Sequence, residues 1–269
     1  MYKSWILLVL TLLMANQATA DFLPRCQAAL EERRWQDAYR VCNDAAEQGF
    51  DEAQYNLARL YHMGFGVERD ILKAERWYIT AAEQGNIEAQ VDLGWYYQSN
   101  SLWFPTDFDA AAQWLKKAAE HGHPEAQWHL AWLYKSGRGV GRSDQVAVRW
   151  LRIAAEQGFS YAQYELAEHY YHGVGVTQDF SAAAHWYRTI AMQGDSMGQQ
   201  RLGRLYLHGH GVREDLSTAY VWSSVSAAQG NERAKADRDF VLKQLTSTQV
   251  EEAQRRSRDC LESGYQNCN

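Results

Sequence analysis

One short motif in the sequence resembles the nucleophile site of a hydrolase. Gly194-Asp195-Ser196-Met197-Gly198 fits the pattern G-x-S-x-G, in which the central serine attacks an acyl carbon. That chemistry requires a sharp turn from a strand into a helix, because the turn exposes the serine hydroxyl. Here the segment joins two predicted helices, and Gly194 is one of a recurring series of helix-ending glycines. We therefore predict no catalytic residue at this motif or elsewhere in the chain.

A second group of side chains has the residue types that bind metal ions. Glu168, His169 and His172 lie close together on one predicted helix. The pattern H-E-x-x-H, which directs two histidines toward zinc, is absent. His169 also falls at a repeat position that Leu60 and Leu133 occupy, which is a packing position. The cysteines have neither C-x-x-C spacing nor clustered histidines, so we expect no metal site and no cofactor.

Four glycine-rich segments have a composition that often serves phosphate binding. They share the pattern G-x-G-V and span residues 64–67, 137–140, 173–176 and 209–212. Phosphate-binding loops lie between a strand and a helix, whereas these segments follow predicted helices. Glycine adopts the positive φ that ends a helix and turns the chain. We therefore attribute these segments to helix termination.

The segments belong to a unit that recurs about every 36 residues. Six glycines close near-identical phrases such as AAEQG, and they are Gly49, Gly85, Gly122, Gly158, Gly194 and Gly230. In the first full unit, Ala53, Leu57 and Leu60 form the apolar face of a helix, and Asp70 caps a second helix after the loop. The sequence thus predicts an all-α stack of helix–loop–helix units, each contacting its neighbours.

Two aromatic positions recur with the same period. The tryptophans are Trp77, Trp114, Trp150, Trp186 and Trp222, and the tyrosines are Tyr61, Tyr97, Tyr134, Tyr170 and Tyr206. Over about residues 50–230 this pattern resembles the Sel1-like repeat, a relative of the tetratricopeptide repeat. The resemblance implies a right-handed α-α superhelical solenoid that holds proteins or extended peptides on a concave face. Many bacterial Sel1-like proteins are exported to the cell envelope, and the resemblance implies that location here.

The repeat pattern divides the chain into segments. We predict a signal peptide over residues 1–20, an N-terminal helical hairpin cap over 21–49 and a C-terminal helical cap over 231–269. The five repeats between the caps are expected at 50–85, 86–122, 123–158, 159–194 and 195–230. Thr248 and Glu251 have the spacing of a capping box, which predicts the start of the final helix.

By the same resemblance, the first helix of each repeat lines a concave binding groove. The expected groove residues are Tyr55, Arg59, Trp95, Trp128, Trp132, Lys135, Tyr164, Glu168, Tyr171 and Arg204. Aromatic rings there give a large contact area at a small cost in conformational entropy. The alternative is that some of these rings fill gaps between helices. In the second repeat Trp103 and Phe104 replace G-x-G-V, and they either form an exposed partner contact or pack against neighbouring helices.

The first twenty residues have the features of a secretory signal peptide. Lys3 precedes an apolar run over residues 5–15, which is too short to span a bilayer. Ala18-Thr19-Ala20 then has the small-x-small pattern of a cleavage site. Cleavage after Ala20 would leave a periplasmic or secreted chain that begins at Asp21 and has no transmembrane segment.

Export would allow the four cysteines to form disulfides. Three pairings are possible, and we expect Cys26 with Cys42 and Cys260 with Cys268, because the two pairs lie at opposite ends of a long array. The chain has a formal net charge of −6 and no basic cluster. This composition argues against a nucleic-acid partner, since phosphate binding depends on clustered Lys and Arg.

The leading hypothesis is a non-enzymatic scaffold of the cell envelope that binds a protein or an extended peptide. One alternative is weak hydrolysis of β-lactams or cell-wall substrates, which is assigned to some cysteine-rich Sel1-like proteins. Those relatives carry cysteine pairs within their repeats, and this chain lacks such pairs as well as S-x-x-K and K-T-G. A further alternative is binding of a cell-envelope glycan, because sugar faces stack on aromatic rings.

Overall fold

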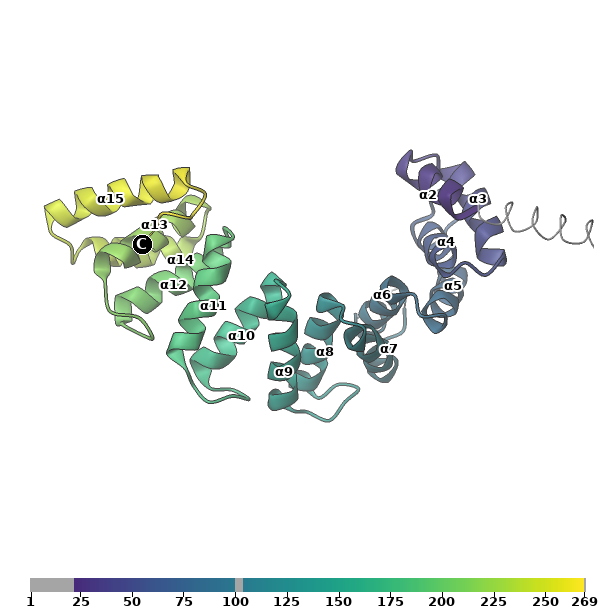
Figure 1. The fold of residues 1–269 in the computed structure, drawn as a ribbon, viewed down its shortest axis with the longest axis horizontal. Coiled ribbons are helices and arrows are strands. Elements are labelled where there is room, and N and C mark those ends of the chain that lie inside the picture. Colours follow the sequence, from purple (N-terminus) through teal and green to yellow (C-terminus); the bar gives the residue numbers. More distant parts are fainter. Residues whose placement is uncertain (1–21, 100–103, 269) are drawn as a thin grey trace, which may run out of the picture. The chain divides into compact units, whose positions relative to one another are not determined.

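The computed structural model describes residues 22–99 and 104–268, in which all regular structure is helical (Figure 1). The helices are α2 (Phe22–Glu31), α3 (Trp35–Glu47), α4 (Asp51–Met63), α5 (Ile71–Glu83), α6 (Ile87–Gln98), α7 (Phe108–Glu120), α8 (Pro124–Ser136), α9 (Asp144–Glu156), α10 (Ser160–His172), α11 (Phe180–Met192), α12 (Ser196–His208), α13 (Leu216–Ala228), α14 (Glu232–Leu242) and α15 (Ser247–Glu262). The predicted all-α solenoid of helix pairs is confirmed. Within the described ranges, no helix combines the length and the apolar character needed to cross a membrane.

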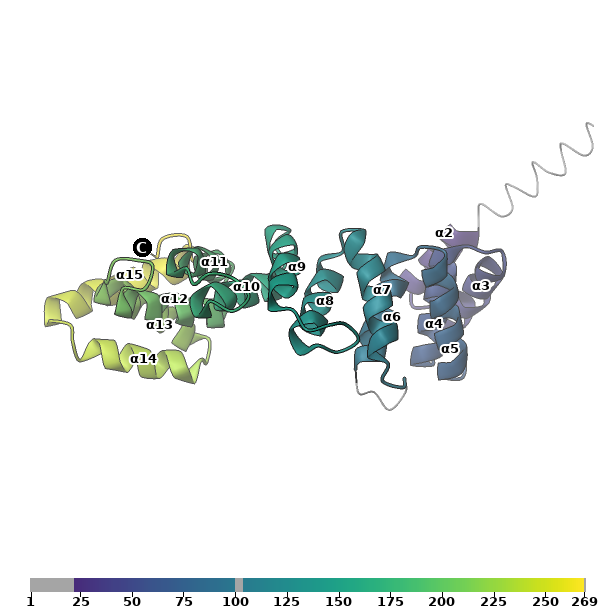
Figure 2. The same cartoon turned by 90° about the horizontal axis from the view of Figure 1, so that it is seen from below.

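The helices form two compact units. The first contains the described residues up to His129 together with 138–140, and the second contains 130–137 and 141–268. In the first unit α4 packs on α5, α5 on α6 and α6 on α7, which Figure 2 shows side by side. In the second unit α10, α11, α12 and α13 pack successively in the same way. We call α4, α6, α8, α10 and α12 the first helices of the repeats, and α5, α7, α9, α11 and α13 the second helices.

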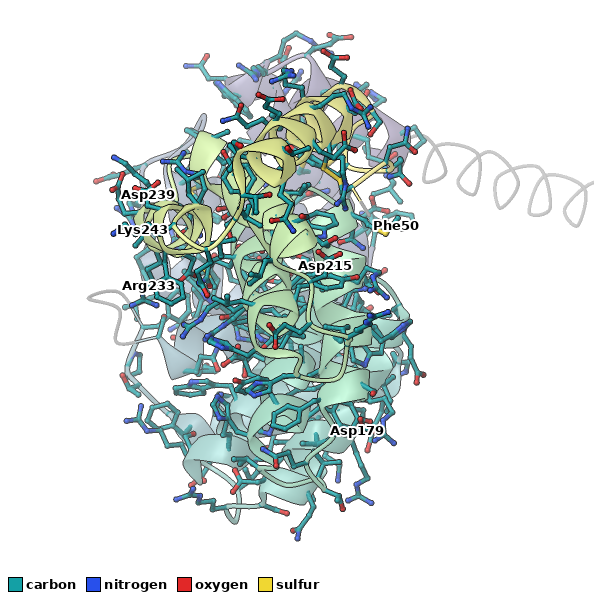
Figure 3. The ribbon with its side chains drawn as sticks, turned by 90° about the vertical axis from the view of Figure 1, so that its left-hand side faces the viewer. Phe50, Asp179, Asp215, Arg233, Asp239 and Lys243 are labelled. Carbon is teal, nitrogen blue, oxygen red and sulfur yellow. A yellow bond between two sulfur atoms is a disulfide. The ribbon has the colours of Figure 1, made fainter. Side chains whose placement is uncertain are left out.

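Short polar side chains begin the second helices. Each accepts a hydrogen bond from a backbone N–H in the first turn, and these caps are Asp70, Asp107, Ser143, Asp179 and Asp215 (Asp179 and Asp215 are labelled in Figure 3). Such a cap satisfies one of the donors that the start of a helix leaves without an intrahelical partner. The predicted cap at Asp70 is confirmed.

The two glycines of each G-x-G-V loop have different roles. The first ends a first helix in the left-handed conformation, as at Gly173, where φ is +69°. The second lies directly against the start of the second helix in the preceding repeat, so a Cβ on Gly175 would overlap the main-chain carbonyl of Asp144. Gly211 meets the carbonyl of Phe180 in the same manner. The loops therefore end helices, as predicted, and also seat one repeat on the one before it.

A buried glutamine in each first helix fastens that helix to the previous one. Its Nε2 donates to the carbonyl oxygen of an alanine eight residues earlier, in the last turn of the preceding helix. The pairs are Gln54–Ala46, Gln90–Ala82, Gln127–Ala119, Gln163–Ala155 and Gln199–Ala191, at 3.0–3.2 Å. The same carbonyl also accepts from the backbone N–H of the glycine three residues later, so each glutamine adds a side-chain donor to a carbonyl at the end of the preceding helix. We call these contacts the glutamine locks.

The two end segments carry the disulfides. Cys26 of α2 is bonded to Cys42 of α3, and Cys260 of α15 is bonded to Cys268. The series of first and second helices ends with α13. The next helix, α14, carries charged residues, and Figure 3 labels Arg233 and Asp239 in it and Lys243 directly after it. A terminal unit needs such a polar surface because no further repeat covers it.

The capping box of α15 differs from the predicted one. Thr246 is the N-cap, and it exchanges hydrogen bonds with Gln249. The prediction of Thr248 with Glu251 was wrong by two residues, because Gln at the third helical position reaches back to the N-cap as Glu does. Thr248 lies inside the first turn.

Candidate functional site

The candidate site is a face of the first helices on which two positions recur, one helical turn apart. In successive repeats the pairs are Asn56/Arg59, Asp92/Trp95, His129/Trp132, Glu165/Glu168 and Arg201/Arg204. Residues three apart on a helix lie on the same side, so both positions of a pair face the same way. We call these the paired positions, and within each unit the surface that they and the neighbouring predicted residues form is the first-helix face of that unit. Six of the ten predicted groove residues lie in the second unit.

In the second unit, Glu168 and three side chains around it form a connected cluster of four. Arg201 on α12 makes a two-point contact with this carboxylate, with Nε 2.9 Å from Oε1 and Nη2 3.2 Å from Oε2. Tyr187 on α11 donates its hydroxyl hydrogen to Glu168, and Tyr164 lies 3.3 Å from Nε of Arg201. Two-point guanidinium–carboxylate contacts fix orientation as well as position. The cluster therefore holds α10, α11 and α12 in one arrangement.

Burial shapes the protonation behaviour of this cluster. Tyr187 is 1% exposed, and desolvation together with the charge of Glu168 raises the pKa of its hydroxyl far above the usual range. Burial lowers the pKa of Arg201, but its hydrogen bond to Tyr164 and the charge of Glu168 outweigh that effect and raise the pKa above its ordinary value. Tyr187 thus stays a neutral donor and Arg201 stays a cation.

The first unit has residues of the same types at the four equivalent positions, with the two charges exchanged. Tyr55 and Tyr78 stand at the repeat positions of Tyr164 and Tyr187, while Arg59 replaces Glu168 and Asp92 replaces Arg201. The guanidinium carbon of Arg59 lies 5.6 Å from the centroid of the Tyr55 ring. Desolvation raises the pKa of Asp92 to about 6, although the hydrogen bond with Tyr55 and the charge of Arg59 act in the opposite direction. The two units therefore place opposite charges at the same two positions with the signs reversed, whereas the ion pair between these positions is formed in the second unit and not between Arg59 and Asp92.

Two cavities in the second unit flank the Glu168–Arg201 pair. The larger has a volume of about 370 Å³, and its wall comprises Lys135, Tyr164, Glu165, Glu168, His169, His172 and Val174. Lys135 of α8 is bonded to Glu165 at 2.8 Å, and His172 lies 3.4 Å from Glu168. His169 is buried, with Nδ1 2.7 Å from the Val174 carbonyl oxygen, so it has a structural contact. Among the described residues, no three side chains of His, Cys, Asp or Glu are grouped so as to hold a metal ion.

The smaller cavity has a volume of about 200 Å³. Tyr171, Tyr187, Arg201, Arg204 and Leu205 form its wall. The Tyr171 hydroxyl oxygen lies 3.2 Å from Nδ1 of His210, and Tyr171 forms part of the cavity wall. Arg204 is exposed and has no hydrogen bond or ion pair with the described residues. Five predicted residues thus line the two cavities, namely Lys135, Tyr164 and Glu168 in the larger and Tyr171 and Arg204 in the smaller.

The remaining predicted groove residues have less connected surroundings. Trp95 on α6 is 47% exposed and packs edge-on against Tyr96. Trp128 is half-buried beside His129, at 4.7 Å between ring centroids, and belongs to the first unit. Trp132 is half-buried and belongs to the second unit. Trp95 is therefore the most accessible of the three tryptophans.

Of the two alternatives for Phe104, the structure shows packing against the neighbouring helices and not an exposed contact. Phe104 is 2% exposed and stacks on Tyr96, with ring centroids 4.5 Å apart and planes within 7° of parallel. His62 and Tyr97 approach the same ring. Because burying an aromatic ring is strongly favourable, the loop turns Phe104 into the repeat. Trp103, the other predicted contact, lies outside the described residues.

The structure gives the G-x-S-x-G segment a local structural role. Ser196 is the first residue of α12, and Asp195 caps that helix by accepting from the Gly198 N–H. The Ser196 hydroxyl lies 3.2 Å from the Ser226 hydroxyl. The segment is a helix-to-helix turn, which lacks the strand that a nucleophile elbow requires.

Sequence reasoning missed two members of the second-unit cluster, Arg201 and Tyr187, and also Glu165 in the wall of the larger cavity. Arg201 was overlooked because its repeat position holds residues as different as Asn56 and Asp92. Tyr187 follows the recurring tryptophan by one residue, and that position is buried in Tyr78 as well. Glu165 pairs with Lys135 across two repeats, which spacing along one helix cannot show. A comparison of each residue with its equivalent in the next repeat would have detected all three.

Comparison with known proteins agrees with this architecture. The sequence matches the Sel1 repeat over residues 51–86, 87–123, 124–159, 160–195 and 196–231. Each of these repeats begins one residue after the predicted boundary. A Sel1-like repeat-containing protein of Acanthamoeba polyphaga mimivirus is 43% identical over 49 residues, which are 18% of this chain and 9% of that protein.

Two solved structures are similar over most of the chain. One is c5321, described as a protective antigen of uropathogenic Escherichia coli with an SLR fold, at 31% identity and a TM-score of 0.73. The alignment covers 86% of this chain and 50% of c5321, so this chain spans about half of that relative's length. The other is a Sel1 repeat protein from Oxalobacter formigenes, with 31% identity, a TM-score of 0.70 and coverage of 80% and 85%. Sel1 repeats are typical of protein–protein interaction scaffolds, and the repeat matches span more than half of the sequence. This chain belongs to the Sel1 repeat family.

Proposed function

We propose that the protein is an exported scaffold that holds an extended segment of a partner protein on its first-helix face. The observation that carries the proposal is the convergence of five groove residues on two neighbouring cavities in the second unit. Tyrosine, arginine and glutamate side chains from three helices meet there, and they offer charge, hydrogen bonds and ring surface to a bound segment.

The cluster around Glu168 supports binding because it is rigid before a partner arrives. The loss of side-chain freedom on binding opposes association, and a surface that is already ordered reduces that loss. Tyr164, Tyr187 and Arg201 are held by mutual hydrogen bonds, so the walls of both cavities keep their shape. Tyrosine and arginine are also the residue types that dominate binding energy at protein interfaces.

The disulfides support an exported location. Cys26–Cys42 and Cys260–Cys268 account for all four cysteines of the sequence. Disulfides persist in oxidising compartments such as the bacterial periplasm and are rare in the reducing cytosol. Together with the signal-peptide pattern of residues 1–20, this pairing favours the cell envelope as the place where the scaffold acts, with helical caps at 21–49 and 231–269.

Position-specific photo-crosslinking in cells tests the proposal. A photoreactive p-benzoylphenylalanine replaces one residue of the first-helix face in each unit, Trp95 or Arg204. The matched controls are exposed residues of second helices, Leu72 in the first unit and Ile153 in the second. We expect the same discrete crosslinked partner from Trp95 and Arg204 and none from the controls, in envelope fractions where the purified chain has the mass of a protein beginning at Asp21.

The control positions make the result decisive. Crosslinks that arise equally from Leu72 and Ile153 would show that the first helices have no special role. A chain that retains residues 1–20 in the cytosolic fraction would refute export while leaving the binding surface intact.

A further inference from the structure

We propose that the cavity formed by Tyr171, Tyr187, Arg201, Arg204 and Leu205 binds the side-chain carboxylate of an Asp or Glu in the partner segment. We call it the acid-binding cavity. The inference rests on the proposed function, because it names the side chain that the scaffold recognises. It depends on the charge balance of the paired positions, the size of the cavity and the surroundings of Arg204.

The paired positions of the last two repeats leave one positive charge uncompensated. The fourth repeat contributes Glu165 and Glu168, and the fifth contributes Arg201 and Arg204. Lys135 neutralises Glu165 at 2.8 Å, and Arg201 neutralises Glu168 at 2.9 Å. Arg204 remains without a partner, on a chain whose formal net charge is −6. These five side chains therefore carry one net positive charge, located at Arg204.

The next acidic residue along this face is engaged elsewhere. Asp237 on α14 stands at the repeat position that follows Arg201, where it would face Arg204 if the pattern of Glu168 and Arg201 continued. Its carboxylate instead accepts a hydrogen bond from Gln200 at 2.5 Å. Arg204 is thus available to a carboxylate from another molecule. Arg201, in the wall of the same cavity, is held in place by its hydrogen bonds to Glu168.

The cavity has room for one side chain. Its volume of about 200 Å³ is below the ~300–1,000 Å³ of sites that enclose whole small ligands. Tyr187 and Leu205 are 1% and 2% exposed, so they close its inner end. A side chain can enter while its backbone continues along the face. An Asp or Glu side chain places its carboxylate at the two guanidinium groups and its methylene groups against Leu205 and the tyrosine rings.

The neighbouring cavity gives the partner segment a direction to continue. Glu168 and its contact with Arg201 separate the two cavities, and Val174 and Tyr164 contribute carbon surface to the larger one. Lys135 and Glu165 neutralise each other at its edge. The larger cavity therefore suits an uncharged side chain close in sequence to the acidic one.

Binding of acid and amide pairs of peptides to the full chain tests the inference. An array of random peptides, all amidated at the C-terminus, is probed with the wild-type chain, and the best binders are resynthesised with single Glu→Gln or Asp→Asn replacements. Fluorescence anisotropy then measures each affinity for wild type, Arg204→Gln and the control Arg213→Gln, which removes an exposed arginine outside the cavity. Circular dichroism verifies that both variants are folded.

We expect one acidic position whose replacement weakens binding roughly tenfold or more, because a hydrogen-bonded charge pair has about that effect. With Arg204→Gln the same replacement should change affinity by less than about twofold, whereas Arg213→Gln should retain the wild-type difference. Discrimination that survives in Arg204→Gln would overturn the acid-binding cavity. If no peptide on the array binds the wild-type chain, the proposed peptide-binding function itself fails.

Discussion

At the scale of single residues, Asp92 links the first-helix face to pH. Desolvation raises the pKa of this carboxyl from 3.8 to about 6, so the folded state binds its proton more tightly than the unfolded chain does. The sign of the effect follows directly. Below about pH 4 the carboxyl is protonated in both states and folding is not opposed. As pH rises from about 4 to 6, ionisation is easier in the unfolded chain, so the stability of the first unit falls.

Asp92→Asn should remove this pH dependence. The amide carries no charge to desolvate, and its oxygen still accepts a hydrogen bond from Tyr55. We expect the free energy of unfolding of the variant, relative to that of wild type, to increase by about 1–3 kcal/mol between pH 4 and pH 7.5. Urea unfolding of both proteins at the two pH values measures the difference, in which titrations common to both cancel. Parallel stability curves for the two proteins would show that Asp92 ionises as freely in the folded state as in water.

At the scale of helices, the reversed clusters of the two units make an exchange of charge feasible. The first unit has a cation at Arg59 and an anion at Asp92, and the second has the anion Glu168 and the cation Arg201 at the same positions. The buried tyrosines Tyr78 and Tyr187 stand at the same repeat position in the two units. The surrounding helix pairs thus accept either polarity, provided that the two charges are opposite.

Glu168→Arg alone should destabilise the second unit by about 2–4 kcal/mol, because it sets two guanidinium groups against each other at half-buried positions. Adding Arg201→Asp should recover at least half of that loss by recreating the first unit's arrangement. Unfolding free energies of the two single variants and the double variant form a cycle that isolates the interaction. Additive losses in the double variant would contradict the equivalence of the two clusters.

Helix boundaries were predictable from the sequence, whereas contacts between repeats were only partly so. Gly64 and Asp70 act through the backbone next to them, so their effect is visible in a short segment of sequence. The glutamine locks also recur at a fixed spacing, but a search for apolar periodicity passes over buried amides such as Gln163. Phe104 could not be placed, because whether a loop ring turns inward depends on the space that His62 and Tyr96 leave.

The same limit applies to the candidate site. Five predicted residues reached the two cavities because they occupy variable positions of first helices, which the family resemblance identifies. The properties of those residues depend on partners in other repeats. Lys135 and Arg204 are both predicted basic residues, yet Glu165 neutralises the first and no described side chain neutralises the second. Only the three-dimensional structure separates a compensated charge from an available one.

At the scale of the whole molecule, each compact unit has one disulfide of its own. Removing Cys26–Cys42 by a double substitution to alanine frees a loop whose ends are 16 residues apart, and a loop of this size corresponds to about 3 kcal/mol. We expect the loss to be confined to the first unit, because in an array each repeat contacts mainly its neighbours. Hydrogen exchange should show faster exchange in α2–α4 and unchanged protection in α11–α13. Equal loss of protection in both regions would show that the array unfolds as a single cooperative body.

The glutamine locks have a consequence for how the chain is made. Every lock points backward, since the glutamine of a new first helix bonds to an alanine that was synthesised eight residues earlier. The second loop glycine likewise rests on a helix of the preceding repeat. In a chain that emerges with its N-terminus first, each new first helix can therefore form its glutamine lock and its loop-glycine contact with helices that are already present. Folding can advance one repeat at a time behind the ribosome or the translocation pore, and the finished part serves as the template for the next.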